Sequence, residues 1–448
     1  MRQSRACAER RNAAALVLLA LVPLAACDVG SVLEIEDPDI ITPGSLEGPI
    51  GRNTLFAGAL GDFSRAYAGG AGGGSFLDGI VTTASYMSDE GIASGTFPTR
   101  QEFDQRSVAI DNGTLRVVFH ELHRARVALE NAAATLGDAD PGDGRVGQLL
   151  AFAGYAYLGF GENFCSGVPF SQAPPAGELT FGEQATTAQM LQFAIDRFDA
   201  AIGQAGVSSE VADLARVGKG RALVGLGQYS EAASAVASVS TDYFFGIEHS
   251  INTGRQENGY NAANIETGRI SVADREGSNG LDFRSAGDPR IETVLVGKGF
   301  DSTTDQYDLL HYPYGYALAR NAPTPLASGI EARLIEAEAA LNAGDVAGFL
   351  AGLNAARAEG GLPPVTDPGA ATAREDLLFR ERAFWLYASG HRLSDLRRLI
   401  RQYGHTEDAV FPTGAYFEGG IYGDDVNLPI PEEEENNPNF RECLDRSA

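Results

Sequence analysis

His120 and His123 are the residues whose type and spacing come closest to a metal site. A zincin helix binds zinc through two histidines four residues apart, with a glutamate between them. In this chain the two histidines are only three residues apart, in the stretch HELH. The spacing therefore favours an ordinary helix surface over a zinc site.

The acidic stretch DADPGDG at 138–144 is a second candidate for metal binding, because it is rich in the oxygen ligands that calcium prefers. An EF-hand loop closes with a glutamate, and the corresponding position in this chain is Leu149. An acidic turn between two helices fits the stretch better. We expect neither a metal nor a cofactor.

The sequence contains no motif typical of an enzyme. It lacks a glycine-rich phosphate loop and a Gly-x-Ser-x-Gly nucleophile elbow. Carboxylate pairs are unavoidable in a chain with 60 Asp and Glu residues, so their presence says little about acid–base catalysis. We predict that the protein is not an enzyme; a glycosidase that uses two facing carboxylates is a minor alternative.

Aromatic and planar polar side chains are concentrated in two segments, 68–112 and 241–328, that have little helical periodicity and are rich in glycine. Such side chains stack on sugar rings and hydrogen-bond their hydroxyl groups. The stretch HYPYGY at 311–316 is the densest cluster, although an aromatic edge packed on helices would have the same composition. The candidate ligand contacts are Tyr86, Asp89, Asn252, Arg255, Tyr260, Tyr307, Tyr312, Tyr314 and Tyr316.

The first 26 residues have the organisation of a signal peptide. Four arginines precede an apolar run at 13–24, which is too short to span a membrane. The residues Leu24-Ala25-Ala26-Cys27 that follow resemble the bacterial lipobox, whose cysteine is acylated, for example with palmitate. We therefore expect a lipid anchor on Cys27, with residues 27–50 as a tether; an ordinary cleaved signal is the alternative.

The net charge of the chain bears on its ligands, and the remaining cysteines bear on a possible disulfide. The chain carries a net charge of −26; residues 1–26 hold four arginines and one glutamate, a net +3, so the remainder carries −29. This charge argues against nucleic-acid binding. With Cys7 in the signal peptide and Cys27 acylated, Cys165 and Cys443 are left as a possible disulfide, or as two free thiols.

The rest of the chain is predicted to be mostly α-helical. Apolar residues recur at helical spacing in three regions, about 114–160, 186–240 and 330–360. Small residues at their turns are typical of tetratricopeptide-like helix pairs that stack into an α-solenoid. We predict one domain over 51–448, built on these helix pairs, with long irregular loops and little β structure.

Four motifs carry a resemblance to a known family. They are RERAFWLYASGHRLSDLRRL (380–399), LPIPEEEENNPNF (428–440), the helix pair at 331–362, and FGENFCSGVPF (160–170). In order and spacing they resemble the SusD/RagB outer-membrane lipoproteins. Two positions depart from the pattern: Ser389 replaces a usually acidic residue, and Asp28 follows the lipid cysteine. We interpret Arg392, Arg397 and Arg398 as structural and Trp385 as a core residue.

The resemblance implies a function in nutrient capture. A SusD-like protein is anchored by lipid in the outer membrane, facing the cell exterior, and caps a TonB-dependent SusC-like β-barrel. It binds an extracellular glycan or oligopeptide and delivers it to that transporter, with the loops at 68–112 and 241–328 forming the ligand face. The alternative is a tetratricopeptide-type scaffold lipoprotein of the cell envelope without a small ligand, which would have no need of long tyrosine-rich loops.

Overall fold

The computed structural model describes residues 48–72, 78–173 and 178–448. The predicted signal peptide, Cys27 and most of the predicted tether lie outside these ranges. Helices dominate the described chain, as the sequence predicts. The α-helices are α1 Pro49–Ala68, α2 Ile80–Tyr86, α3 Pro98–Asp104, α4 Gly113–Ala139, α5 Arg145–Asn163, α6 Thr187–Gly203, α7 Ser209–Gly225, α8 Tyr229–Val236, α9 Gly259–Asn261, α10 Gly329–Asn342, α11 Val346–Glu359, α12 Ala371–Trp385, α13 Arg392–Arg401 and α14 Glu407–Val410.

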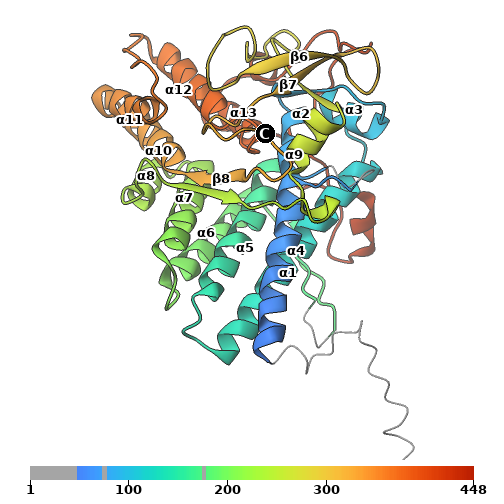
Figure 1. Cartoon of the computed structure of the whole chain (residues 1–448), viewed down its shortest axis with the longest axis vertical. Coiled ribbons are helices and arrows are strands. Elements are labelled where there is room, and N and C mark those ends of the chain that lie inside the picture. The colour runs from blue at the N-terminus through green and yellow to red at the C-terminus, as the bar shows by residue number, and fades with distance from the viewer. Residues whose placement is uncertain (1–47, 73–77, 174–177) are drawn as a thin grey trace, which may run out of the picture.

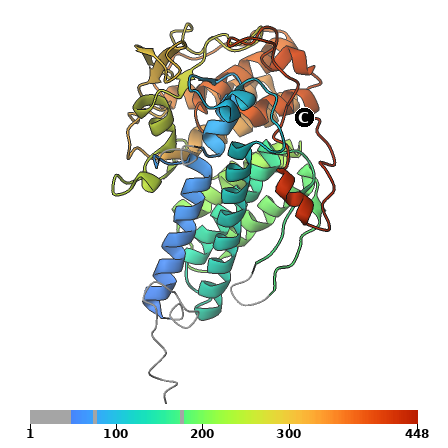
Figure 2. The same cartoon turned by 90° about the vertical axis from the view of Figure 1, so that its right-hand side faces the viewer.

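Helices adjacent in sequence pack against one another through most of the scaffold. The long helices α1, α4, α5, α6 and α7 lie side by side in one half of the molecule (Figures 1 and 2), and α10 packs on both α8 and α11. These are the helix pairs predicted at 114–160, 186–240 and 330–360. The acidic stretch at 138–144 is the turn between α4 and α5, where Asp140 Oδ1 accepts a hydrogen bond from the Gly142 amide.

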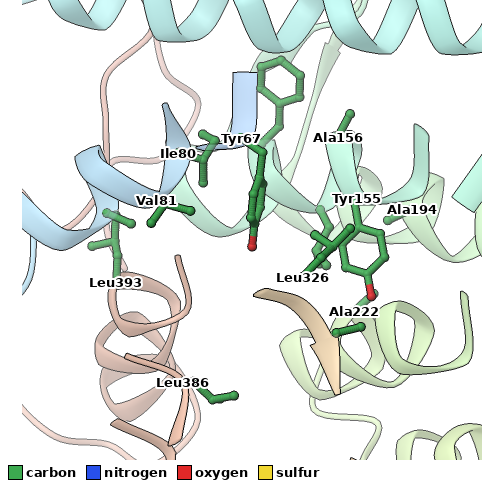
Figure 3. Packing of buried hydrophobic residues seen from close by; sticks show 14 of the residues in the cluster. Tyr67, Ile80, Val81, Tyr155, Ala156, Ala194, Ala222, Leu326, Leu386 and Leu393 are labelled. Carbon is green, nitrogen blue, oxygen red and sulfur yellow. The ribbon is translucent and has the colours of Figure 1, made fainter. Parts of the chain in front are cut away.

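Glycines inside the helices allow this close packing. A Cβ atom on Gly154 of α5 would lie 2.6 Å from the ring of Phe198 in α6, and one on Gly218 of α7 would lie 2.4 Å from the same ring. Because one phenylalanine fills the space between three helices, only glycine fits at these two positions. Tyr155 of α5 belongs to the same core, in which Figure 3 shows it close to Ala222 and Leu326.

The two segments predicted to be irregular contain short regular elements. The segment 68–112 holds α2, β1 and α3, and 241–328 holds most of the strands. Each strand pairs with one other strand only, in the antiparallel pairs β1–β5, β2–β3, β4–β8 and β6–β7. Strands of two to six residues are too short to show alternation in a sequence. Their bounds are β1 Gly91–Ala93, β2 Val168–Pro169, β3 Gln184–Ala185, β4 Phe244–Ile247, β5 Ile270–Val272, β6 Thr293–Lys298, β7 Asp305–Leu309 and β8 Thr324–Ser328.

The arginine-rich motif at 380–399 covers the end of α12 and most of α13, and its charged side chains other than Arg380 are buried. Arg398 pairs with Glu338 of α10 and with Asp395, and Arg397 donates to the carbonyls of Gly161 and Glu162 at the end of α5. This confirms their structural role. Arg392 is the first residue of α13 and pairs with Asp89.

The C-terminal tail returns to the middle of the chain. Cys165 and Cys443 form a disulfide that spans 278 residues of sequence. Backbone hydrogen bonds join the same two regions, from Cys165 N to Leu428 O (2.9 Å) and from Ser166 N to Asp445 O (3.0 Å). The tail is therefore fixed against the end of α5 by covalent and backbone bonds together.

Among the helices that the structure describes, none combines the length and the apolar character needed to cross a membrane.

Candidate functional site

Four of the candidate ligand contacts are buried in the structure and cannot touch a ligand. They are Tyr86, Asp89, Tyr260 and Tyr312, each at most 1% exposed. The Tyr86 hydroxyl donates to Arg269 O (3.0 Å), and the Tyr312 hydroxyl accepts from Asn258 Nδ2 (3.0 Å). The prediction is wrong for these four because long loops need a core of their own, and aromatic side chains supply it.

Two further candidates, Asn252 and Arg255, are exposed but lie elsewhere. Arg255 forms an ion pair with Asp62 of α1 (2.6 Å), so it ties the loop before α9 to the scaffold. Neither residue lines the two concavities described below.

Tyr307 lines the largest of the described concavities, with a volume of about 730 Å³, which we call the β7 groove. Its walls come from segments that are far apart in sequence: β1, α3, β5, the turn before β7, β7 itself and a hairpin at 414–422. Both segments predicted to form the ligand face contribute to it. The lining residues are Ile92, Thr96, Gln101, Ser271, Arg284, Asp301, Thr303, Thr304, Asp305, Tyr307, Phe417 and Glu418.

Two aromatic side chains stand in the β7 groove. The guanidinium of Arg284 lies 3.6 Å from the centre of the Tyr307 ring, so it holds that ring in place by a cation–π contact. Arg284 Nε is buried and has no hydrogen-bond partner among the described residues. Phe417, at the tip of the 414–422 hairpin, is 44% exposed. The groove is thus lined by two aromatic rings, and Arg284 covers one face of the Tyr307 ring.

The amide and carboxylate side chains that line the β7 groove are held in position by hydrogen bonds and an ion pair. Gln101 Nε2 donates to Glu418 (2.6 Å), and burial together with the nearby charge of Asp301 raises the pKa of Glu418. Burial raises the pKa of Asp301 as well, but hydrogen bonds from Thr304 and Thr303 lower it overall. Asp305 pairs with Lys298 at 2.6 Å.

A pair of buried carboxyl groups attaches the 414–422 hairpin to the body. The Tyr416 hydroxyl donates to Asp104 (3.1 Å), and the Tyr422 hydroxyl donates to Glu276 (3.0 Å). Burial raises the pKa of Asp104 to about 7, and burial together with the charge of Asp104 raises the pKa of Glu276 well above its usual range. The hairpin is therefore attached through two carboxyl groups whose pKa values are raised by burial.

Tyr314 and Tyr316 line a second concavity of about 400 Å³, which we call the hairpin pocket. It lies between the hairpin at 311–317, the start of β4 and the end of α11. The structure thus brings the aromatic candidates to two places, with Tyr307 in one and the HYPYGY tyrosines in the other.

Of the twelve residues that line the β7 groove, only Tyr307 was a candidate from the sequence. The other eleven include Gln101, Arg284, Phe417 and Glu418. The pair Phe417-Glu418 could have been found, because an aromatic residue between Gly414 and Gly419-Gly420 is typical of an exposed hairpin tip. No sequence signal distinguishes Arg284 from the many other arginines.

His120 and His123 do not form a metal site in the structure. The His123 ring lies 4.6 Å from Phe119 and 4.3 Å from Phe160, and burial lowers its pKa well below the usual value. His120 is exposed on the same helix. Within the described ranges, no group of three or more His, Cys, Asp or Glu side chains could hold a metal ion.

Comparisons with known proteins bear on the fold. No protein-family model and no curated protein sequence matches the chain. Solved structures do match. A SusD superfamily protein from Bacteroides thetaiotaomicron is 15% identical, with a TM-score of 0.66 over 88% of this chain and 99% of that one. A laminarin-binding SusD-like protein is 17% identical (TM-score 0.63; 89% and 99% covered), and a SusD-like carbohydrate-binding protein from Bacteroides fragilis is 15% identical (TM-score 0.61; 88% and 99%).

These matches span nearly the whole described chain and nearly the whole of each solved structure. They agree with the four motifs that resemble the SusD/RagB family and with the helix pairs that position those motifs. The chain has the fold of the SusD superfamily.

Proposed function

We propose that the protein is a non-catalytic glycan-binding lipoprotein whose β7 groove holds an extracellular oligosaccharide for delivery to a SusC-like TonB-dependent barrel. The observation that carries this proposal is the aromatic pair Tyr307 and Phe417 in a groove of about 730 Å³. Sugar rings present apolar faces that stack on such side chains. Two of the solved structures with this fold are described as binding laminarin or carbohydrate.

The polar lining favours a sugar over an extended peptide. Gln101, Glu418 and the threonines at 303 and 304 present side-chain groups that can accept or donate bonds to hydroxyls. An extended peptide would gain most from the unpaired edge of a strand. β7 pairs with β6 along one edge. Along its other edge the Tyr307 amide donates to Ser271 Oγ (2.9 Å) and the Leu309 amide donates to Asn264 Oδ1 (2.8 Å), so neither amide is left for a peptide strand.

The carboxylates of the groove support a binding role without catalysis. A glycosidase needs two carboxyl groups that face each other across the bond to be broken. In the β7 groove Asp301 caps the turn at 303–304, Asp305 pairs with Lys298, and Glu418 accepts from Gln101. Each carboxylate is thus already engaged in holding the groove together.

Calorimetry against a panel of neutral oligosaccharides tests the binding function. We expect one series to bind, and Tyr307→Ala and Phe417→Ala each to weaken binding at least about tenfold, or about 1.4 kcal/mol. Ile421→Ala is the control, because Ile421 is exposed on the same hairpin but does not line the groove. Binding of peptides alone, or binding unaffected by both groove variants, would refute the proposal.

Anchoring and delivery are tested separately. The lipid anchor predicts that Cys27→Ala releases the protein from the outer membrane. The delivery role predicts that the wild type co-purifies with a TonB-dependent β-barrel. A protein that stays with other envelope proteins, binds no barrel and binds no glycan would instead support the scaffold alternative.

A further inference from the structure

The hairpin pocket has a rigid aromatic wall. Tyr316, which is 43% exposed, stacks on Phe244 of β4 with ring centres 4.8 Å apart and planes 30° apart. The Tyr312 amide donates to Tyr316 O (2.8 Å), and the Gly315 amide donates to Tyr312 O (2.9 Å). Gly315 adopts a φ of +80°, which the turn of this hairpin requires and which favours glycine. The ring of Tyr316 is therefore held in place before any ligand arrives.

Trp385 forms part of the opposite side of the hairpin pocket, at the end of α12. The side chain is 1% exposed, and its indole N–H has no hydrogen-bond acceptor among the described residues. A Cβ atom on Gly360, just after α11, would lie 2.2 Å from the indole ring. The absence of a side chain at Gly360 thus brings the backbone onto the indole and shapes this side of the pocket.

The charges around the hairpin pocket disfavour an anionic ligand. The cation at its wall, Arg290, is bound by Asp288 (2.7 Å) and Glu381 (2.8 Å). The rim carries the exposed carboxylates Asp242 and Glu359. An aromatic face beside carboxylate acceptors suits a neutral ring that carries hydroxyl groups.

The hairpin pocket and the β7 groove share two chain segments. Tyr307 lines the groove and His311 lines the pocket. The two residues are four positions apart in the chain, a separation that spans at most about 14 Å. In a second segment, Arg284 lines the groove and Arg290, six positions further along the chain, lines the pocket. A single oligosaccharide of several rings is long enough to reach from one to the other.

We infer that the hairpin pocket is a second saccharide subsite, in which Tyr316 stacks on a neutral sugar ring of the same glycan chain that occupies the β7 groove. The inference rests on the proposed function, since it extends that glycan beyond the groove. Two linked subsites raise affinity for long chains, because binding of the second ring is intramolecular once the first is bound.

The test is calorimetry with size-defined gluco-, manno- and xylo-oligosaccharides, from disaccharide to octasaccharide. For the series that binds, we expect affinity to rise with chain length and Tyr316→Ala to weaken the longest oligomers about tenfold. The same variant should leave di- and trisaccharide binding unchanged. Tyr307→Ala should weaken short and long oligomers alike.

Leu310→Ala is the matched control, because Leu310 is exposed next to the hairpin but lines neither concavity. If Tyr316→Ala binds the longest oligomers as tightly as the wild type while Tyr307→Ala does not, the second subsite is refuted and the proposed function survives. If no series binds to the wild type, both are refuted.

Discussion

The buried acids Asp104 and Glu276 make folding stability depend on pH in a way that can be calculated. Asp104 Oδ1 and Glu276 Oε2 are both buried, and among the described residues no amide, guanidinium or hydroxyl group donates to either oxygen. The two carboxyl groups hydrogen-bond each other. Two carboxylates cannot remain ionised side by side in such a site, so the pair keeps at least one proton in the folded protein. In the unfolded chain both groups lose their protons near their ordinary values of 3.8 and 4.5.

The direction in which stability changes with pH follows from the direction of the two pKa shifts. Because folding raises both pKa values, the contribution of the pair to stability is complete below about pH 4 and is lost as the pH rises toward the folded values, about 7 for Asp104 and higher for Glu276. Each retained proton makes the free energy of unfolding fall by about 1.4 kcal/mol per pH unit. One proton retained between pH 5 and pH 7 therefore costs about 3 kcal/mol.

Glu276→Gln isolates this effect. The amide keeps the size of the side chain, can accept from Tyr422 and can donate to Asp104, but it does not titrate. Because Asp104 stays buried in both proteins, only the proton of Glu276 differs, and we expect the wild type to lose about 3 kcal/mol relative to the variant between pH 5 and pH 7. His123 and His249, whose pKa burial lowers, affect both proteins equally and cancel in the difference.

Urea unfolding at pH 5, 6 and 7 measures this difference, with the fluorescence of Trp385, the single tryptophan, as the probe. Glu435→Gln is the control for loss of an exposed carboxylate, and its unfolding curves should follow those of the wild type at each pH. A difference between wild type and Glu276→Gln that does not change with pH would show that the acids share no proton.

Three further predictions concern stability. Arg392→Met leaves the charge of Asp89 buried without its partner, and urea unfolding should show a loss of about 3–5 kcal/mol. Replacing Cys165 and Cys443 together by alanine removes a crosslink over 278 residues; we expect a loss of about 2–5 kcal/mol by the same assay, and no further loss when reductant is added. Gly154→Ala places a methyl group 2.6 Å from Phe198 and should cost about 1–3 kcal/mol in thermal or urea unfolding, with partial recovery in a Phe198→Leu background.

The helical scaffold could be predicted from the sequence because its signals are local. Apolar residues such as Leu122 and Leu129 recur at the helical period over three or more turns, and both are fully buried in α4. The turn at 138–144 was predictable for the same reason, since its acidic residues bond to backbone amides one or two residues away. The short strands were not predictable, because their pairing partners lie far away in the chain.

The candidate site could be predicted only in part, because composition does not reveal burial. Tyr307 and Tyr312 are five residues apart and have the same chemistry, yet one lines the β7 groove and the other is fully buried beneath Asn258. The two tyrosines differ in burial because different parts of the fold surround them. Phe417 enters the groove through a hairpin more than 100 residues further along the chain, which no local pattern connects to Tyr307.

Asp89 shows how the arginine-rich motif at 380–399 can act on the β7 groove without touching it. Arg392, at the start of α13, binds Asp89 through two hydrogen bonds of 2.6 and 3.0 Å. The same carboxylate accepts from the Leu281 amide (2.8 Å), three residues before Arg284, whose guanidinium stacks on Tyr307. A bidentate ion pair in the core thus fixes the loop that presents the arginine, and the arginine fixes the ring. The motif at 380–399 therefore sets the geometry of the groove through a carboxylate that the sequence suggested as a ligand contact but that the fold uses as a support.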